Sequence, residues 1–164
     1  MATTYEAIQT TTLGSSAATI TFSSIPATYT DLRLVIVCTA NSGSIAPKIR
    51  MNSLSTGIYS GTTLTGNGSS ASTGQYTSDD KWGVGTLVAS TPTLITVDIF
   101  SYTGSTFKTN LTSVSKDQNG SGVVLPSVNL CRSTAAITSL TILESIGNDY
   151  AAGTTATLYG ILAA

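Results

Sequence analysis

The chain has 164 residues, of which only 9% are Asp, Glu, Lys or Arg, against roughly 25% in typical soluble domains. The formal net charge is -1, which excludes the basic surface that attracts nucleic acid and the polybasic patch that binds a membrane. No apolar run approaches the roughly 20 residues that a membrane span needs. We therefore expect neither a nucleic-acid partner nor a membrane partner.

The first third of the chain predicts short strands separated by turns. Weak alternation over residues 5–12 indicates a first strand, and residues 18–22 form a second with Ile20 and Phe22 on one face. The Ile25-Pro26 step then interrupts the pattern, because proline fixes φ and lacks a donor. The clearest strand follows, and its alternating positions predict one core-facing set: Leu32, Leu34, Ile36 and Cys38.

The middle of the chain is rich in Gly, Ser and Thr. Residues 48–52 predict a strand with Ile49 and Met51 on one face. Residues 56–75 include TGNGSSASTG and predict a long loop with one short strand at 59–64. Residues 82–88 predict a further strand, and after Pro92 comes another with Ile95, Val97 and Ile99 on one face.

The last third contains the strongest hairpin signal. Segments 107–116 and 123–130 flank Asn119-Gly120, a pair that supplies the positive φ angles of a tight turn. Residues 137–146 predict the most apolar strand and residues 155–162 the closing one. With 23 Ser, 30 Thr and no helical periodicity, the chain is predicted to be all-β. We expect one domain over residues 1–164, an antiparallel two-sheet sandwich, jelly-roll-like, with about eight to ten short strands.

Residues that carry out chemistry are scarce. The chain has no histidine, which removes Ser-His and Cys-His nucleophile pairs, and no phosphate or dinucleotide motif is present. A carboxylate pair, Asp98 with Glu144, is the remaining candidate for glycan cleavage. Asp79-Asp80 lacks the ligand spacing of a calcium loop. We therefore expect no enzyme activity, no catalytic residue, no cofactor and no metal.

Two cysteines and several aromatic residues remain. Cys38 and Cys131 both fall in predicted strands, where they are interpreted as buried reduced thiols, with a disulfide as the alternative. Loop aromatics could cap the core, bind a protein or stack on sugars. Asp31 and Arg33 share the outward face of one strand and could pair or meet a neighbouring subunit. The candidate assembly or ligand contacts are Tyr29, Asp31, Arg33, Tyr59, Tyr76 and Trp82.

The low charge itself points to assembly. Charge keeps free proteins apart in solution, whereas interface cores are depleted in charge because a desolvated charge is costly. A chain this poor in charge suits a protein that is packed against neighbours.

Several stretches resemble a family of small proteins encoded by tailed bacteriophages, including phages of cyanobacteria. The most specific is the Ile25-Pro26 break followed by TYTDLRLVIV, within TYEAIQTTTLGSSAATITFSSIPATYTDLRLVIV. LTGNGSSASTG, ITVDIFSYTGSTFKT and AAITSLTILESIGNDYAAGTTATLYGI resemble the same family, so the similarity covers nearly the whole chain. The resemblance implies a virion structural protein and brings no catalytic residues.

The resemblance does not place the protein on the virion, and the leading expectation, which also uses the low charge of the chain, is capsid decoration. Such a cement protein would bind the outer capsid surface, bridge neighbouring copies of the major capsid protein and stabilise the shell. We expect a homo-oligomer, a trimer, located on the virion surface and assembled in the host cytoplasm. The alternative is a tail fibre, spike or baseplate component that attaches to host-surface glycans.

Overall fold

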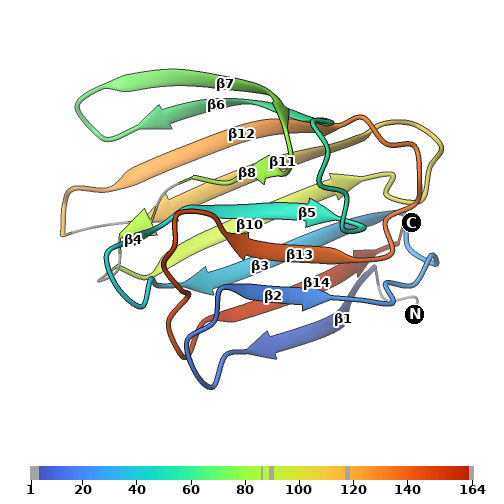
Figure 1. Ribbon diagram of the computed structural model, residues 1–164, viewed down its shortest axis with the longest axis horizontal. Coiled ribbons are helices and arrows are strands. Elements are labelled where there is room, and N and C mark those ends of the chain that lie inside the picture. Colours follow the sequence, from blue (N-terminus) through green and yellow to red (C-terminus); the bar gives the residue numbers. More distant parts are fainter. Residues whose placement is uncertain (1–3, 86, 89–90, 117–118, 163–164) are drawn as a thin grey trace.

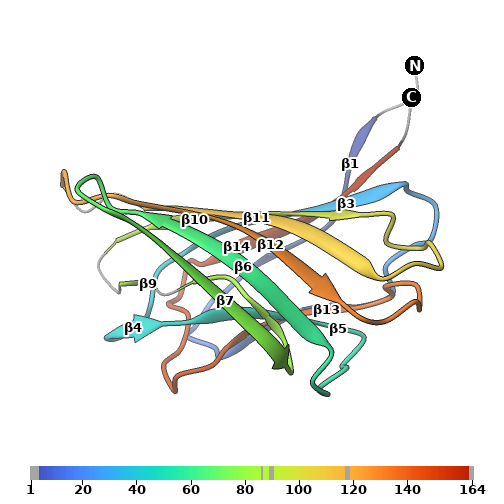
Figure 2. The same cartoon turned by 90° about the horizontal axis from the view of Figure 1, so that it is seen from above.

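A computed structural model describes residues 4–85, 87–88, 91–116 and 119–162. The described chain is all-β and forms two facing antiparallel sheets, a β-sandwich (Figures 1 and 2). The predicted fold class is therefore confirmed. In the part of the chain that is described, 14 strand segments are present, more than the eight to ten expected, and three of them have only two residues.

The larger sheet has eight strands. Their order is β1 (Tyr5–Thr12), β14 (Thr155–Ile161), β3 (Asp31–Cys38), β10 (Thr93–Phe100), β11 (Lys108–Lys116), β12 (Val123–Cys131), β6 (Tyr59–Gly66) and β7 (Ala71–Asp79). The smaller sheet has the order β2 (Thr19–Phe22), β13 (Leu140–Glu144), β5 (Pro47–Met51) and β8 (Trp82–Gly83). A further pair joins β4 (Ser44–Ile45) to β9 (Leu87–Val88). Figure 2 shows the smaller sheet lying across one face of the larger.

The core lies between the two sheets and follows the alternation of the sequence. In β10, Ile95, Val97 and Ile99 have no exposed surface, and in β3 the predicted core-facing residues are all buried. Successive side chains of a strand point to opposite faces, so every second residue of these strands enters the core. Cys38 and Cys131 are buried and free, which confirms their interpretation as thiols.

The Ile25-Pro26 segment carries the chain from one sheet to the other. The smaller sheet contains β2, which ends at Phe22, and the larger sheet contains β3, which begins at Asp31. Ile25 is buried, its backbone N–H donates to the Thr138 carbonyl at 3.0 Å, and the Pro26 carbonyl accepts a hydrogen bond from the Tyr102 hydroxyl. The segment is therefore a structural corner between layers.

Two sequence predictions were wrong in this region of the fold. Residues 56–75 are largely a long hairpin, β6–β7, because threonine fits a pleated strand and only residues 67–70 form the turn. The Asn67 side chain accepts the backbone N–H groups of Ser69 and Ser70 there, at 3.0 and 2.8 Å. The strand predicted at 82–88 is instead two short strands, β8 and β9, with residue 86 outside the described residues.

The strand predicted at 137–146 is also shorter than expected. It begins at Leu140 and ends at Glu144, and Ile146 is 54% exposed rather than core-facing. The chain leaves the strand at Glu144 because that carboxylate binds the backbone of the following turn, as described below. Within the described ranges, no helix is long and apolar enough to cross a membrane.

Candidate interaction surface

The outer face of the eight-stranded sheet is the face that points away from the smaller sheet. The strand register places one outward residue from each strand in a continuous row across it: Ala7, Tyr159, Arg33, Asp98, Leu111, Val128, Thr62 and Gln75. This row crosses the whole sheet, so residues far apart in the sequence form one surface.

The outer face is largely apolar and open to solvent. In the described part of the chain, ten large hydrophobic side chains are exposed, and eight of them belong to this face: Tyr5, Val37, Leu64, Leu94, Phe100, Leu111, Val124 and Val128. Val124 is 58% exposed and Leu111 is 50% exposed. Single exposed hydrophobic residues are ordinary, but eight on one sheet face, among hydroxyl side chains, make this face a candidate interaction surface.

This face carries few charges, which are one ion pair and one further carboxylate. From the six inner strands, the charged residues that point outward are Asp31, Arg33 and Asp98. Arg33 and Asp98 form a two-pronged ion pair, and the hydrogen bond to Asp98 raises the pKa of Arg33. The Asp31 carboxylate accepts the backbone N–H of Ser101 at 2.7 Å. The suggestion that Asp31 and Arg33 pair with each other is therefore wrong, since each has a different partner.

A shallow groove of about 550 Å³ lies on the outer face, across β10, β11, β12, β6 and β7. Its lining combines aliphatic and hydroxyl side chains, including Leu64, Thr73, Leu111, Pro126 and Val128, with Asp98 as its charged residue. No aromatic ring lines the groove. The groove therefore offers van der Waals contact to another apolar surface and no stacking platform for a sugar ring.

The outside of the smaller sheet has a different character. Its outward side chains are mainly Thr19, Thr21, Thr141, Lys48 and Arg50, with Leu143 among them. Hydroxyl and charged groups are well solvated, so this side of the molecule offers little apolar area to bury. The two faces of the sandwich therefore differ, and only the outer face of the eight-stranded sheet is apolar.

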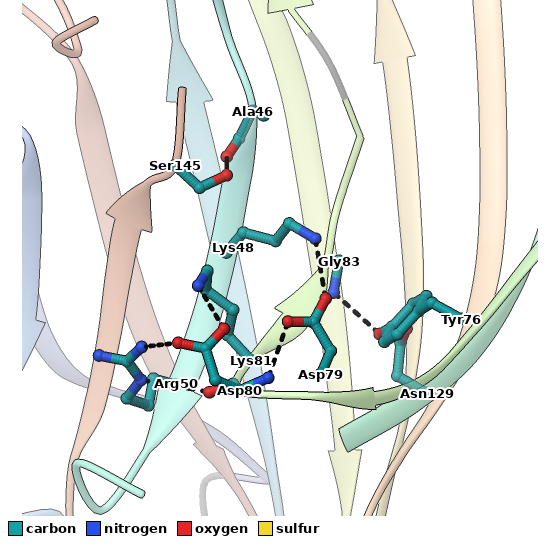
Figure 3. Close-up of polar contacts among 10 residues, drawn as sticks. All are labelled: Ala46, Lys48, Arg50, Tyr76, Asp79, Asp80, Lys81, Gly83, Asn129 and Ser145. Carbon is teal, nitrogen blue, oxygen red and sulfur yellow. Dashed lines mark hydrogen bonds and ion pairs between the residues drawn. The ribbon is translucent and has the colours of Figure 1, made fainter. Parts of the chain in front are cut away.

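An ion-pair network closes the side of the sandwich near β8 (Figure 3). Lys48 contacts Asp79 at 3.3 Å, and both Arg50 and Lys81 contact Asp80. The hydrogen bond from Lys81 is the main reason that the pKa of Asp80 falls to about 2. No group of three or more His, Cys, Asp or Glu residues suited to hold a metal occurs in the described residues. The two aspartates act as ion-pair partners that tie β7 to β5.

Two of the predicted contact residues are core residues, which fits the interpretation that loop aromatics cap the core and not the one that they bind a partner. Tyr59 and Trp82 have no exposed area, and their rings pack edge to face with centroids 5.8 Å apart. The Tyr59 hydroxyl donates to the Leu54 carbonyl at 3.1 Å and accepts the Met51 N–H at 3.2 Å. Because β6 and β8 turn inward here, both rings fill the space between the sheets and contact no ligand or neighbour.

Tyr76 and Tyr29 are half-buried, and each is engaged within the chain. The Tyr76 hydroxyl donates to Asn129 Oδ1 at 2.6 Å and accepts the Gly83 N–H at 2.8 Å (Figure 3), and burial raises its pKa to about 12. The Tyr29 hydroxyl donates to Glu6 at 2.9 Å, and this hydrogen bond raises its pKa. Of the six predicted contact residues, the structure places Asp31 and Arg33 on the outer face.

The candidate carboxylate pair does not assemble. Asp98 points out of the larger sheet toward Arg33, whereas Glu144 ends β13 in the smaller sheet. The Glu144 carboxylate accepts backbone N–H groups of Ala46, Ile146, Gly147 and Asn148 at 2.7–3.0 Å. Each carboxylate has its own structural role, so together they do not form the flanking pair of a glycosidase.

The sequence interpretation missed most of the outer face. Core residues alternate along their strands with Leu111, Val128, Leu94 and Phe100, and none of these four is among the predicted contact residues. A signal was present, because a strand with apolar residues on both faces is typical of a sheet that is covered on both sides.

Comparison with protein-family models, with curated proteins and with solved structures finds no match to this chain.

Proposed function

We propose that this protein is a structural protein of a bacteriophage virion, of the capsid decoration kind, that acts by binding protein neighbours. The observation that carries the proposal is the outer face of the eight-stranded sheet, which is poor in charge and exposes eight large hydrophobic side chains. The phage-family resemblance of the Ile25-Pro26 corner and strand β3 supports the virion context, and the low charge of the chain suits a packed environment.

The size of the outer face fits a specific protein contact. Eight strands about 4.8 Å apart, each about eight residues long at ~3.3 Å per residue, span roughly 34 by 26 Å, or about 900 Å². A standard specific interface buries about 800 Å² on each partner. A single outer face is therefore large enough to hold one copy on a shell of major capsid proteins.

The proposed action is mechanical. A decoration protein that contacts two neighbouring capsid subunits adds buried apolar area between them. Repetition over a closed shell turns modest individual contacts into high avidity. The Arg33–Asp98 pair lowers the cost of docking, because the two charges already satisfy each other before water is removed.

The direct test is to locate the chain by cryo-electron microscopy in particles of the phage that encodes it. We expect density for the sandwich on the outside of the capsid, with the eight-stranded sheet against the shell. Density only on the tail would overturn the capsid proposal and favour the tail-component alternative.

A matched pair of variants tests which face docks. Leu111→Lys with Val128→Lys places two charges on the outer face, and we expect at least a tenfold loss of binding to undecorated shells. Thr19→Lys with Thr21→Lys adds the same charge to exposed positions outside the smaller sheet and should leave binding unchanged. Equal loss in both variants, or loss in the second alone, would contradict the assigned face.

A further inference from the structure

The β7 strand is an open edge of the eight-stranded sheet. It pairs with β6 and, within the described chain, with no other strand, and Figure 1 shows it at the margin of the sheet. Its register with β6 is regular over six consecutive residues, from Ala71 to Tyr76, and the irregularity lies beyond them, where Ser78 has φ +56°. Along these six residues one side of the backbone therefore has N–H and C=O groups with no strand beside them.

The other edges of the eight-stranded and four-stranded sheets carry features that block pairing, and the remaining β4–β9 pair has only two residues in each strand. At the opposite edge of the larger sheet, β1 has a register shift between Ala7 and Gln9 and carries Glu6. In the smaller sheet, β2 has four residues and β8 has two. Bulges, charges and short strands are the devices that keep edges from joining. The stretch Ala71–Tyr76 has none of them: it contains no charge, no proline and no bulge.

We propose that β7 pairs with β7 of a second copy of this chain, antiparallel and about a twofold axis. Self-pairing suits this strand because residues 71–78 carry no charge, so identical strands meet without like charges facing each other. Ser72 and Thr73 are exposed and lie near the centre of the stretch, where hydroxyl side chains can hydrogen-bond across the new pair.

A contact of this kind about a twofold axis is complete with two copies. Each copy uses the same edge, so pairing leaves no free β7 for a third chain, and the product is a dimer rather than a fibre. This differs from the trimer expected from the sequence. Eight strands from each copy would join into one sheet of 16 strands.

The pairing would also join the two outer faces. Thr73 of β7 and Leu64 of β6 line the groove on the outer face, so the grooves of two copies would flank the new junction. The inference does not depend on the proposed virion role, since an edge pairs through its backbone whether or not the face beside it docks on a shell.

Sedimentation of the purified chain over a concentration series tests the inference. We expect a reversible monomer–dimer equilibrium, with twice the chain mass at high concentration. Thr73→Lys puts two lysines close together at the junction and should raise the dissociation constant roughly tenfold or more. Thr12→Lys is the matched control, an exposed threonine on the opposite edge strand β1, and should leave the equilibrium unchanged.

Hydrogen exchange of the wild-type chain gives a readout that needs no variant. Amides within residues 71–76 should exchange more slowly at high protein concentration, while amides of β1 should not change. A monomer at all concentrations, a trimer, or a dimer whose β7 amides stay unprotected would each overturn the inference. A dimer that Thr12→Lys disrupts as strongly as Thr73→Lys would overturn it as well.

Discussion

Arg33 and Asp98 lie directly opposite each other on β3 and β10 and form a two-pronged ion pair, with 2.5 Å between Nε and Oδ1 and 2.7 Å between Nη2 and Oδ2. The pair stands in the middle of an otherwise apolar face. Its side chains are 39% and 26% exposed, so water still screens the interaction. The ion pair therefore contributes little to the stability of the fold. Its main effect is that the two charges on the outer face are paired with each other.

Replacing both partners should leave folding nearly unchanged. We expect Arg33→Leu with Asp98→Leu to change the free energy of unfolding by no more than about 1 kcal/mol, because partly exposed ion pairs contribute little. Urea unfolding at pH 7 measures this. The single variant Asp98→Leu leaves an unpaired guanidinium on the apolar face and should be the less stable of the two. A loss above about 3 kcal/mol in the double variant would show that the pair holds the sheets together.

Glu144 should contribute to acid stability, in addition to Asp80, whose pKa falls to about 2. Burial raises its pKa, but hydrogen bonds from the N–H groups of Ala46, Ile146, Gly147 and Ser145 outweigh this, and the net pKa is lowered. The stabilisation is therefore complete above the ordinary Glu pKa of about 4.3 and is lost as pH falls through the lower folded pKa. Glu144→Gln should cost about 1–3 kcal/mol at pH 7, since an amide has one acceptor oxygen in place of two.

The control for this prediction is Glu6→Gln. Glu6 is exposed, and its one side-chain hydrogen bond found in the structure comes from Tyr29, so the change should stay within about 0.5 kcal/mol. Urea unfolding at pH 7 and pH 3 compares the variants. The difference between Glu144→Gln and wild type should shrink at pH 3. If it is the same at both values, the carboxylate does not hold the turn as described.

Stability should also fall at alkaline pH. Burial raises the pKa of Cys38 to about 12 and that of Cys131 to about 11, whereas a free thiol titrates near 8.5. Between these values the unfolded chain has released protons that the folded chain keeps, so the free energy of unfolding decreases as pH rises. Burial lowers the pKa of Lys108, and this shift makes the free energy of unfolding increase as pH rises. Lys108 is a single group, whereas two thiols act in the other direction.

Urea midpoints at pH 7, 9 and 10.5 measure this effect. We expect little change up to about pH 8 and a progressive fall above it. Cys38→Ala should flatten the slope between pH 9 and pH 10.5, whatever its effect on absolute stability. A wild-type midpoint that stays constant to pH 10.5 would contradict the burial of both thiols.

The local sequence pattern was sufficient to predict strands such as β3 and β10, but not which strands lie beside them in the sheet. The alternation in β3 and β10 and the Asn119-Gly120 turn, with φ of +56° and +89°, are visible in a few consecutive residues. That β3 lies between β10 and β14 depends on pairs that are 55–67 residues apart for β10 and 118–130 residues apart for β14, which no local pattern contains. The outer face was missed for this reason, since it exists only when eight strands are placed side by side.

Composition misled the prediction where threonine and glycine are dense. Strand β7 was assigned to a loop because Ser, Thr and Gly are frequent in turns, although threonine is also a good strand residue. Trp82 and Tyr59 are named as candidate contacts because turn-rich sequence lies beside them, although both are fully buried. Their burial follows from the packing of β8 against β6 and β12, which only the assembled sandwich shows.

The last prediction concerns Gly160, where the absence of a side chain leaves space for the ring of Tyr29. A Cβ at Gly160 would collide with the ring of Tyr29, whereas a Cβ at Gly14 would meet nothing. Gly160→Ala should therefore cost about 1–3 kcal/mol by overpacking, and Gly14→Ala should stay within about 0.5 kcal/mol. Thermal and urea unfolding give both values. Removing the ring relieves the collision, so Gly160→Ala in a Tyr29→Ala background should cost much less than in wild type. Equal costs in the two backgrounds would mean that the ring does not lie over Gly160.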